Sequence, residues 1–226
     1  WLSSCYMQLG KIKEAQAISP DYYMVPPIDR RLTVESDRFS ELSNMFAQAG
    51  NLERALEYAL RCADIEKQVA GKEHIWYGNS TIIIGNLYYA LGDSINAEEN
   101  YLINKNICKH TYGEYSERYV DALLSLASVN TDFSMKDGLD KATRYLDEAY
   151  SIAHKRYPLL EAQIVNQQSV IAFRNKNYEQ AKTLMMQALS LCELAEGKTS
   201  NNYEILLSNT IDLYQMFGQY DEAITL

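Results

Sequence analysis

The 226-residue sequence has few of the residues that build catalytic or metal-binding sites. It contains three histidines, and none has a second histidine or a cysteine three or four positions away, as a zinc site on a helix would need. It has no phosphate-binding loop of the GxGxxG or GxxxxGK[ST] kind and no GxSxG nucleophile elbow. These absences favour a non-catalytic protein and predict no cofactor and no metal.

Cysteine is also sparse. Cys5, Cys62, Cys108 and Cys192 lie far apart, form no CxxC pair and fall inside helical patterns. Buried free thiols in a reducing compartment are therefore the expectation. We expect a cytoplasmic protein, with a cytoskeletal or ciliary location as the narrower alternative.

The sequence has neither a basic stripe nor a long hydrophobic run. Its net charge is −9, so nucleic acid and anionic lipid are disfavoured as partners. The longest apolar stretch, residues 81–91, is too short and too interrupted to cross a bilayer, and no membrane insertion is expected. The chain begins at Trp1 and stops at Leu226 inside a helical pattern, which predicts a piece of a longer protein.

What the sequence does contain is an internal repeat. A glycine and a tyrosine six residues apart recur at a spacing of 42 residues or a multiple of it. The pairs are Gly71 with Tyr77, Gly113 with Tyr119 and, after two periods, Gly197 with Tyr203. A fixed period between about 20 and 50 residues is typical of stacked repeat proteins.

Helical patterns follow one another along the whole chain, and nothing resembles strands joined by hairpin turns. Gly50 ends one helix and Asn51 caps the next. We predict an all-α solenoid of about six antiparallel helix pairs, forming one domain over residues 1–226, with a proline-containing connection at 19–29 and a small insertion near 132–137. The predicted helices are 1–9, 11–19, 30–49, 51–70, 74–91, 94–110, 116–130, 138–156, 158–176, 178–195, 201–217 and 219 onward.

The second helix of each predicted pair carries a small residue one turn from its start. These positions are Ala15, Ala55, Ala97, Ala142, Ala181 and Ala223. Further small residues follow seven positions later, at Cys62, Ala149 and Ala188, and aromatic residues precede the alanines by nine positions, at Tyr6, Phe46, Tyr88 and Tyr214. Small side chains at these spacings predict closely packed antiparallel helices with aromatic wedges between them.

This pattern resembles the tetratricopeptide repeat family, and the Gly71–His74 and Gly113–Ser116 turns resemble those of its kinesin light chain-like, 42-residue subtype. The resemblance covers nearly the whole chain and implies that His74 fixes the turn between two repeats. It also implies a superhelix whose concave face, lined by the first helix of each pair, binds a partner. The chain departs from the pattern near residues 132–136, in its short first pair and at Lys176, which replaces a glycine.

The candidate groove residues lie on the first helices, off the aromatic wedge. They are Asn44, Asn79, Asn86, Tyr89, Asp121, Asn166, Arg174, Asn209 and Asp212. Side-chain amides both donate and accept hydrogen bonds, so such a row suits the backbone of an extended peptide, although the same residues could simply be solvated. Arg174 is the one clear cation on this line, which favours a neutral or basic peptide over an acidic one.

Two functions from different classes are compatible with this sequence. The first is a protein–protein interaction scaffold that binds a peptide or protein partner within a larger complex. The second is a regulatory region of a larger enzyme or signalling receptor. A structural subunit of a cytoskeletal or ciliary assembly is a further alternative. Because no catalytic motif is visible, the scaffold is the preferred interpretation.

Overall fold

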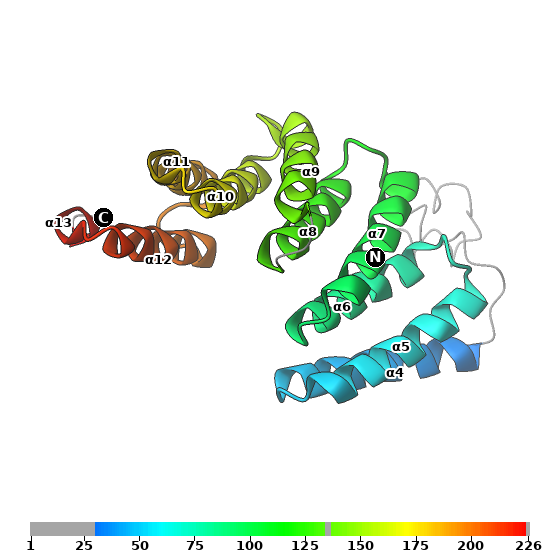
Figure 1. Cartoon of the computed structure of the whole chain (residues 1–226). Coiled ribbons are helices and arrows are strands. Elements are labelled where there is room, and N and C mark those ends of the chain that lie inside the picture. The colour runs from blue at the N-terminus through cyan, green and yellow to red at the C-terminus, as the bar shows by residue number, and fades with distance from the viewer. Residues whose placement is uncertain (1–29, 134–136, 225–226) are drawn as a thin grey trace. The chain divides into compact units, whose positions relative to one another are not determined.

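The computed structural model describes residues 30–133 and 137–224, and all regular structure in these residues is helical (Figure 1). The helices are α4 (Arg30–Gln48), α5 (Leu52–Val69), α6 (Ile75–Ala90), α7 (Ser94–Tyr112), α8 (Glu117–Asp132), α9 (Gly138–Ala153), α10 (Pro158–Arg174), α11 (Tyr178–Glu196), α12 (Asn201–Met216) and α13 (Tyr220–Ile224). The predicted first pair, the connection 19–29, Cys5, Tyr6 and Ala15 lie outside the described residues.

The chain divides into two compact units, Trp1–Gly113 and Glu114–Leu226, and each is described by itself. In the described residues the first unit contains the pairs α4–α5 and α6–α7. The second contains α8–α9, α10–α11 and α12–α13. Within each unit, consecutive pairs pack against each other, as α5 does against α6 and α11 against α12.

Side chains cap α5, α6 and α7 of the first unit at their N-termini. The Asn51 Oδ1 atom accepts a hydrogen bond of 3.2 Å from the Arg54 amide, as predicted. The His74 Nδ1 atom accepts one of 3.2 Å from the Trp76 amide, so this histidine holds the turn that opens α6. The structural role that the sequence suggested for His74 is confirmed.

The small residues at repeating positions are buried between the helices. Four of the alanines, Ala55, Ala97, Ala142 and Ala181, are completely inaccessible, and Ala223 is nearly so. Cys62, Ala149 and Ala188, seven positions after three of them, are buried too. The predicted packing is confirmed at each of these positions in the described part of the chain.

In the pair α6–α7, glycines on the first helix bring the two backbones closer still. A Cβ atom on Gly85 would lie 2.6 Å from the ring of Tyr101, and one on Gly78 would lie 2.9 Å from the Ile107 side chain. Both distances are shorter than van der Waals contact allows. Tyr101 and Ile107 of α7 therefore occupy the space that any larger residue on this face of α6 would need.

In the second unit, α8, α9 and α10 enclose the largest buried cluster. Leu123 on α8, Leu146 on α9 and Ile164 on α10 are fully buried within it. A second cluster joins α10, α11 and α12 through residues such as Ala162, Cys192 and Tyr203. These two clusters fix both sides of α10.

Residues with left-handed backbone conformation mark the repeat. One series precedes the first helices, and the other lies between the helices of a pair. The first series is Gly71, Gly113, Lys155 and Gly197, and the second is Gly50, Gly92, Lys176 and Gly218. Neighbours within a series are one or two 42-residue periods apart. Lys155 was absent from the predicted pattern, so the repeat is more regular in backbone geometry than in residue type.

The predicted helix 138–156 is too long, because α9 ends at Ala153. Lys155 turns left-handed, with φ of 58°. The buried carboxylate of Glu161 stabilises this turn by accepting the Lys155 amide at 3.0 Å and by contacting His154 Nδ1 at 2.8 Å. A lysine thus takes the place of a glycine, and Glu161 takes the place of the repeat's tyrosine.

The segment near 132–137 changes where a helix begins rather than the length of the repeat. Asp137 is left-handed, and α9, which follows it, has 16 residues where α7 and α11 each have 19. Because α9 starts late and is also short, the residues that follow it keep their place in the repeat. Consequently Gly113, Lys155 and Gly197 keep the 42-residue spacing.

Candidate partner-binding groove

Three of the predicted residues, Asn166, Asn209 and Asp212, line one groove between α10 and α12, with a cavity volume of about 270 Å³. We call it the α10–α12 groove. It is lined by Asn166, Ser169, Val170, Phe173, Met185, Asn209, Asp212, Leu213 and Met216. All belong to the second unit.

The two walls of the groove have the same design. On α10 the lining residues fall at positions i, i+3, i+4 and i+7 from Asn166, and on α12 they fall at the same spacing from Asn209. This spacing places four side chains on one face of each helix. Because α11 reverses the chain between them, α10 and α12 run in the same direction, and equivalent positions lie at the same end of the groove.

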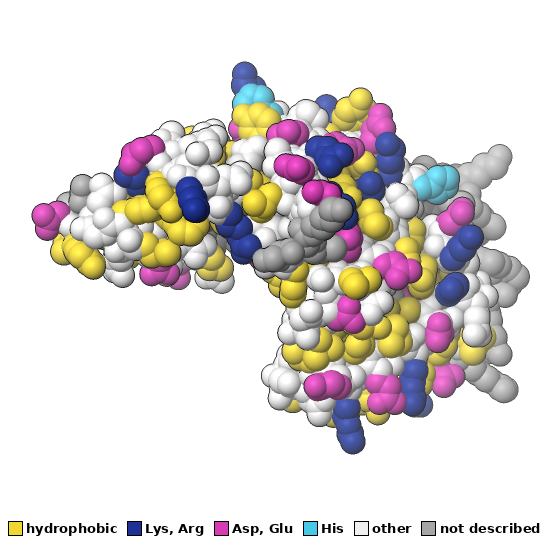
Figure 2. Space-filling model, viewed as in Figure 1, with side chains coloured by type: hydrophobic (Ala, Val, Ile, Leu, Met, Phe, Trp, Pro, Cys, Tyr) yellow, Lys and Arg dark blue, Asp and Glu magenta, His cyan; other side chains and the backbone are white. Residues whose placement is uncertain are grey.

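One end of the groove is polar and the other is apolar. Asn166, Asn209 and Asp212 provide amides and one carboxylate at the start of the two rows. Phe173 and Met216 close the other end, and Met216 is 68% exposed. Figure 2 shows hydrophobic side chains at the surface over α12 and α13, at the left of the view. An exposed methionine beside an aromatic ring is an adaptable surface for an apolar side chain.

The polar end has an unsatisfied acceptor. The buried Oδ1 atom of Asn166 accepts no hydrogen bond from any described residue. A buried carbonyl oxygen without a donor costs about 1–3 kcal/mol. An N–H group brought into the groove would relieve this cost after a rotation of the amide.

Asp212 is the one charged residue among those that line the groove. It is exposed, and its carboxylate gives this surface a negative charge without a lining cation to balance it. Coulomb attraction to a lysine or arginine and repulsion of a glutamate follow directly.

Arg174 lies on α10 but does not line this groove. Its guanidinium donates to the Asp132 carboxylate on α8 at 3.1 Å, one period earlier in the chain. Gln167 makes a similar link, donating to Ser128 Oγ at 2.9 Å. Arg174 and Gln167 together tie α10 to α8, so the cation that the sequence offered to a partner is already paired.

Asp121 lies in a separate pocket of about 250 Å³ between the start of α8 and the α9–α10 turn. Glu117, Arg156 and Tyr157 are among its other lining residues. Desolvation by the pocket raises the pKa of the Asp121 carboxyl, and the charge of Arg118 opposes the shift.

Four predicted residues belong to the first unit and so are described apart from the groove. Asn44 is exposed on α4, and Asn79 and Asn86 are exposed on α6. Asn86 accepts a 2.8 Å hydrogen bond from the hydroxyl of Tyr101, whose pKa burial raises to about 12. Tyr89 is half-buried on α6. A role of these residues in binding stays a prediction.

Sequence reasoning missed the apolar half of the groove. Val170, Phe173, Leu213 and Met216 were passed over because only polar residues were sought on the first helices. A usable signal was present, since the two rows repeat polar, polar, apolar, apolar at the same spacing about one period apart.

In the described residues, the cysteine and histidine side chains do not gather into one site. Cys62, Cys108 and Cys192 are buried and form no disulfide, as predicted, and burial raises the pKa of Cys62 and Cys192. No group of three or more potential metal-ligating side chains occurs in the part of the chain that the structure describes. Within the same residues, no helix is long and apolar enough to span a bilayer.

Comparison with known families identifies the repeat. Two family models of the tetratricopeptide repeat match the chain, one at residues 37–75 and the other at residues 162–193. No curated protein matches the chain in sequence.

Solved structures support the same fold. A kinesin light chain-like protein of Podosopora anserina, built of nearly identical TPR-like repeats, is 18% identical to this chain and has a TM-score of 0.63. The alignment covers 86% of this chain and 90% of that one. BtubC (BKLC) from P. vanneervenii is 15% identical with a TM-score of 0.66, covering 99% and 84%. The assembly chaperone of RpL4 is 11% identical with a TM-score of 0.56, covering 98% and 84%. At these identities the likeness establishes an all-α solenoid fold and nothing further.

Proposed function

Since this chain is a tetratricopeptide repeat protein, we propose that it is a non-catalytic scaffold that binds a peptide or protein partner in the α10–α12 groove. The observation that carries this proposal is the convergence of Asn166, Asn209 and Asp212 with an apolar surface on two first helices. Stacked helix pairs commonly present such extended surfaces to partners.

The groove favours an extended segment that has an apolar anchor at one end. Phe173, Leu213 and Met216 would cover the anchor, and the two asparagines would hydrogen-bond the peptide backbone beyond it. After a rotation of its amide, Asn166 would offer the unsatisfied Oδ1 atom as the acceptor for a backbone N–H.

The charge of the groove favours a neutral or basic segment over an acidic one. Asp212 carries the only charge among the lining residues, and Arg174 is engaged by Asp132. The chain as a whole has a net charge of −9, which adds long-range attraction for a basic partner.

The other first helices carry Asn44, Asn79, Asn86 and Tyr89 in the first unit and Asp121 in the second. We propose that they contact a longer partner, as the resemblance to tetratricopeptide repeats implies. A cytoplasmic location within a larger complex, cytoskeletal or ciliary as the narrower form, belongs to the same proposal and is supported by the fold shared with kinesin light chain-like proteins.

A peptide array tests the groove directly. The whole chain is applied to extended peptides that contain one leucine or phenylalanine flanked by neutral, basic or acidic residues. We expect basic and neutral peptides to bind better than acidic ones. Asp212→Lys should reverse this order. We expect it to weaken the binding of basic peptides and strengthen the binding of acidic peptides by about fivefold each, because an exposed ion pair contributes up to about 1 kcal/mol.

Asp64→Lys is the matched control, since Asp64 is exposed on α5 of the first unit and carries the same substitution. It should leave the order of binding unchanged. Strongest binding by acidic peptides, or the same response from both variants, would refute the groove as the contact surface.

A further inference from the structure

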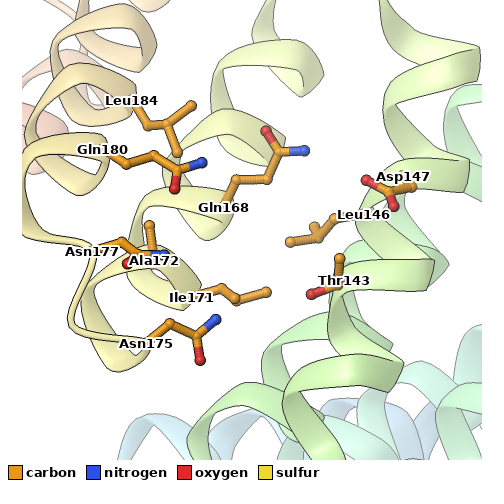
Figure 3. Close-up of a pocket in the computed structure, with 10 residues that line it drawn as sticks. All are labelled: Thr143, Leu146, Asp147, Gln168, Ile171, Ala172, Asn175, Asn177, Gln180 and Leu184. Atoms are coloured by element: carbon orange, nitrogen blue, oxygen red, sulfur yellow. The ribbon is translucent and has the colours of Figure 1, made fainter.

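A second hollow lies on the other side of α10, between α9, α10 and α11 (Figure 3). Its cavity volume is about 310 Å³, slightly larger than that of the α10–α12 groove. We call it the amide pocket. It is lined by Thr143, Leu146, Asp147, Gln168, Ile171, Ala172, Asn175, Asn177, Gln180 and Leu184.

The floor of the amide pocket is apolar and firmly held. Leu146, Ile171 and Ala172 are buried residues, and Leu184 is half-buried. Figure 3 shows Leu146 of α9 and Ile171 of α10 pointing toward each other across the pocket. Small-molecule pockets begin at about 300 Å³, so this one suits an aliphatic or aromatic side chain rather than a large cofactor.

The rim of the pocket is rich in side-chain amides. Gln168 on α10, Asn175 and Asn177 in the α10–α11 turn, and Gln180 on α11 contribute one each. None of the four side chains forms a hydrogen bond with another described residue. Each carboxamide offers two N–H donors and an acceptor oxygen, so the rim can pair with both the N–H and C=O groups of a peptide backbone.

Asp147 is the only charged residue among those that line the pocket. Thr143, its neighbour on α9, already donates its hydroxyl hydrogen to the Leu139 carbonyl at 2.8 Å. The carboxylate is exposed, and it lies across the pocket from the rim amides (Figure 3). It therefore favours a lysine or arginine close to the apolar side chain that enters the pocket.

The pocket and the groove use opposite faces of the same helix. The α10 residues of the groove start at Asn166 and follow the spacing i, i+3, i+4, i+7. Those of the pocket start at Gln168 and follow the spacing i, i+3, i+4, with Asn175 at i+7 just past the end of the helix. Two residues correspond to a rotation of about 200° around an α-helix. One site therefore cannot be a continuation of the other.

We propose that the amide pocket is a second docking site, which takes the apolar side chain of an extended partner segment with a lysine or arginine beside it. The rim amides bind the backbone on both sides of that residue, and Asp147 pairs with the cation. This site is independent of the α10–α12 groove and would let the scaffold hold two segments at once.

Isotope-edited NMR of the whole chain provides the test. The probes are capped five-residue peptides with leucine at the centre, flanked either by two lysines or by two glutamates. We expect the dilysine peptide to shift the side-chain amide signals of Gln168, Asn175 and Gln180 in a saturable manner. The diglutamate peptide should bind about fivefold more weakly, which is the most that one exposed ion pair contributes.

Three variants locate the site. Asp147→Lys should reverse the preference between the two peptides, while Asp212→Lys in the groove should leave the pocket shifts unchanged. Thr143→Trp, which places a bulky ring at the exposed pocket edge, should abolish the shifts. Circular dichroism confirms that each variant is folded, and Asp64→Lys controls for the change in net charge.

Other outcomes overturn the proposal. Shifts confined to groove residues, no saturable shift, or equal binding of both peptides to unmodified protein would exclude a basic peptide as the occupant. A dimer seen by sedimentation and lost in Thr143→Trp would assign the pocket to a second copy of the chain instead.

Discussion

The two units make the same turns with different residues. In the first unit, glycine occupies all the left-handed positions of the described chain, at Gly50, Gly71, Gly92 and Gly113. In the second unit, three such positions are taken by other residues, namely Asp137, Lys155 and Lys176. The repeat is therefore defined by backbone conformation at fixed spacing. Glycine is the residue that adopts this conformation at the lowest energetic cost.

The units also bring paired helices together differently. In the first unit, the α6–α7 pair places glycine on one helix opposite a large ring on the other, as Gly85 and Tyr101 show. In the second unit, large residues such as Leu123 and Leu146 fill the space between α8 and α9. Glycine contacts make the first arrangement intolerant of added volume, so substitutions there should have the largest effects.

Gly85→Leu should be the most damaging change to the first arrangement. Even a Cβ atom would lie 2.6 Å from the Tyr101 ring, and a full leucine side chain forces α6 and α7 apart. We expect a loss of about 3 kcal/mol in the free energy of unfolding, measured by urea denaturation. Ala90→Leu, exposed on the same helix, is the control and should be nearly neutral. Equal midpoints for the two variants would show that this close contact is not formed.

Ala97→Leu should cost somewhat less, about 1–3 kcal/mol, because overpacking at an alanine leaves more room for adjustment than overpacking at a glycine. Ala181→Leu in the second unit should cost a similar amount, since both alanines are completely buried. Thermal and urea melts check both, with the exposed Ala195→Leu as control. A loss in one variant only would mean that the repeated small residue has different roles in the two units.

Exchanging lysine and glycine at two turns should change stability by smaller amounts, with opposite signs at the two positions. Lys176 has φ of 62°, and Lys176→Gly should stabilise the second unit by about 1 kcal/mol, because a left-handed conformation strains any residue with a Cβ atom. Gly92→Lys should destabilise the first unit by a similar amount, although nothing lies near its Cβ position. If both substitutions were neutral, backbone strain at these turns would be unimportant.

The fold was predictable because its signals are local. Glycine turns, helix caps such as Asn51 and buried small residues such as Ala97 each depend on a short stretch of chain. The end of α9 was not predictable in this way. Lys155 takes a glycine-like conformation that the carboxylate of Glu161 stabilises from the next helix, and a propensity for helix gives no sign of it.

The groove was only half predictable, because it depends on contacts between repeats. Asn166, Asn209 and Asp212 were chosen as polar residues on first helices, and they do line one groove. Arg174 was chosen by the same rule, but its pairing with Asp132 depends on how α10 packs against α8. Spacing within one helix predicts the face on which a side chain lies. It does not predict which residue of another repeat lies opposite that side chain.

The smallest expected effect concerns pH and a half-buried carboxyl of the first unit. Glu66 on α5 accepts a 2.6 Å hydrogen bond from Ser80 on α6, yet desolvation raises its pKa above the ordinary value of 4.5. The folded state therefore binds this proton more tightly than the unfolded state. Its stabilising contribution is complete below pH 4.5 and decreases as the pH rises through the raised pKa of the folded state.

Glu66→Gln removes this titration, so it should flatten the fall of stability with pH above 4.5 without altering the plateau below it. Urea midpoints measured between pH 4.5 and 7.5 give the two slopes. Glu53→Gln, exposed on the same helix, should keep the slope of the unmodified protein. A steeper fall in Glu66→Gln would mean that the carboxylate stabilises the fold in its charged form, and that the α5–α6 contact favours the ion in spite of its burial.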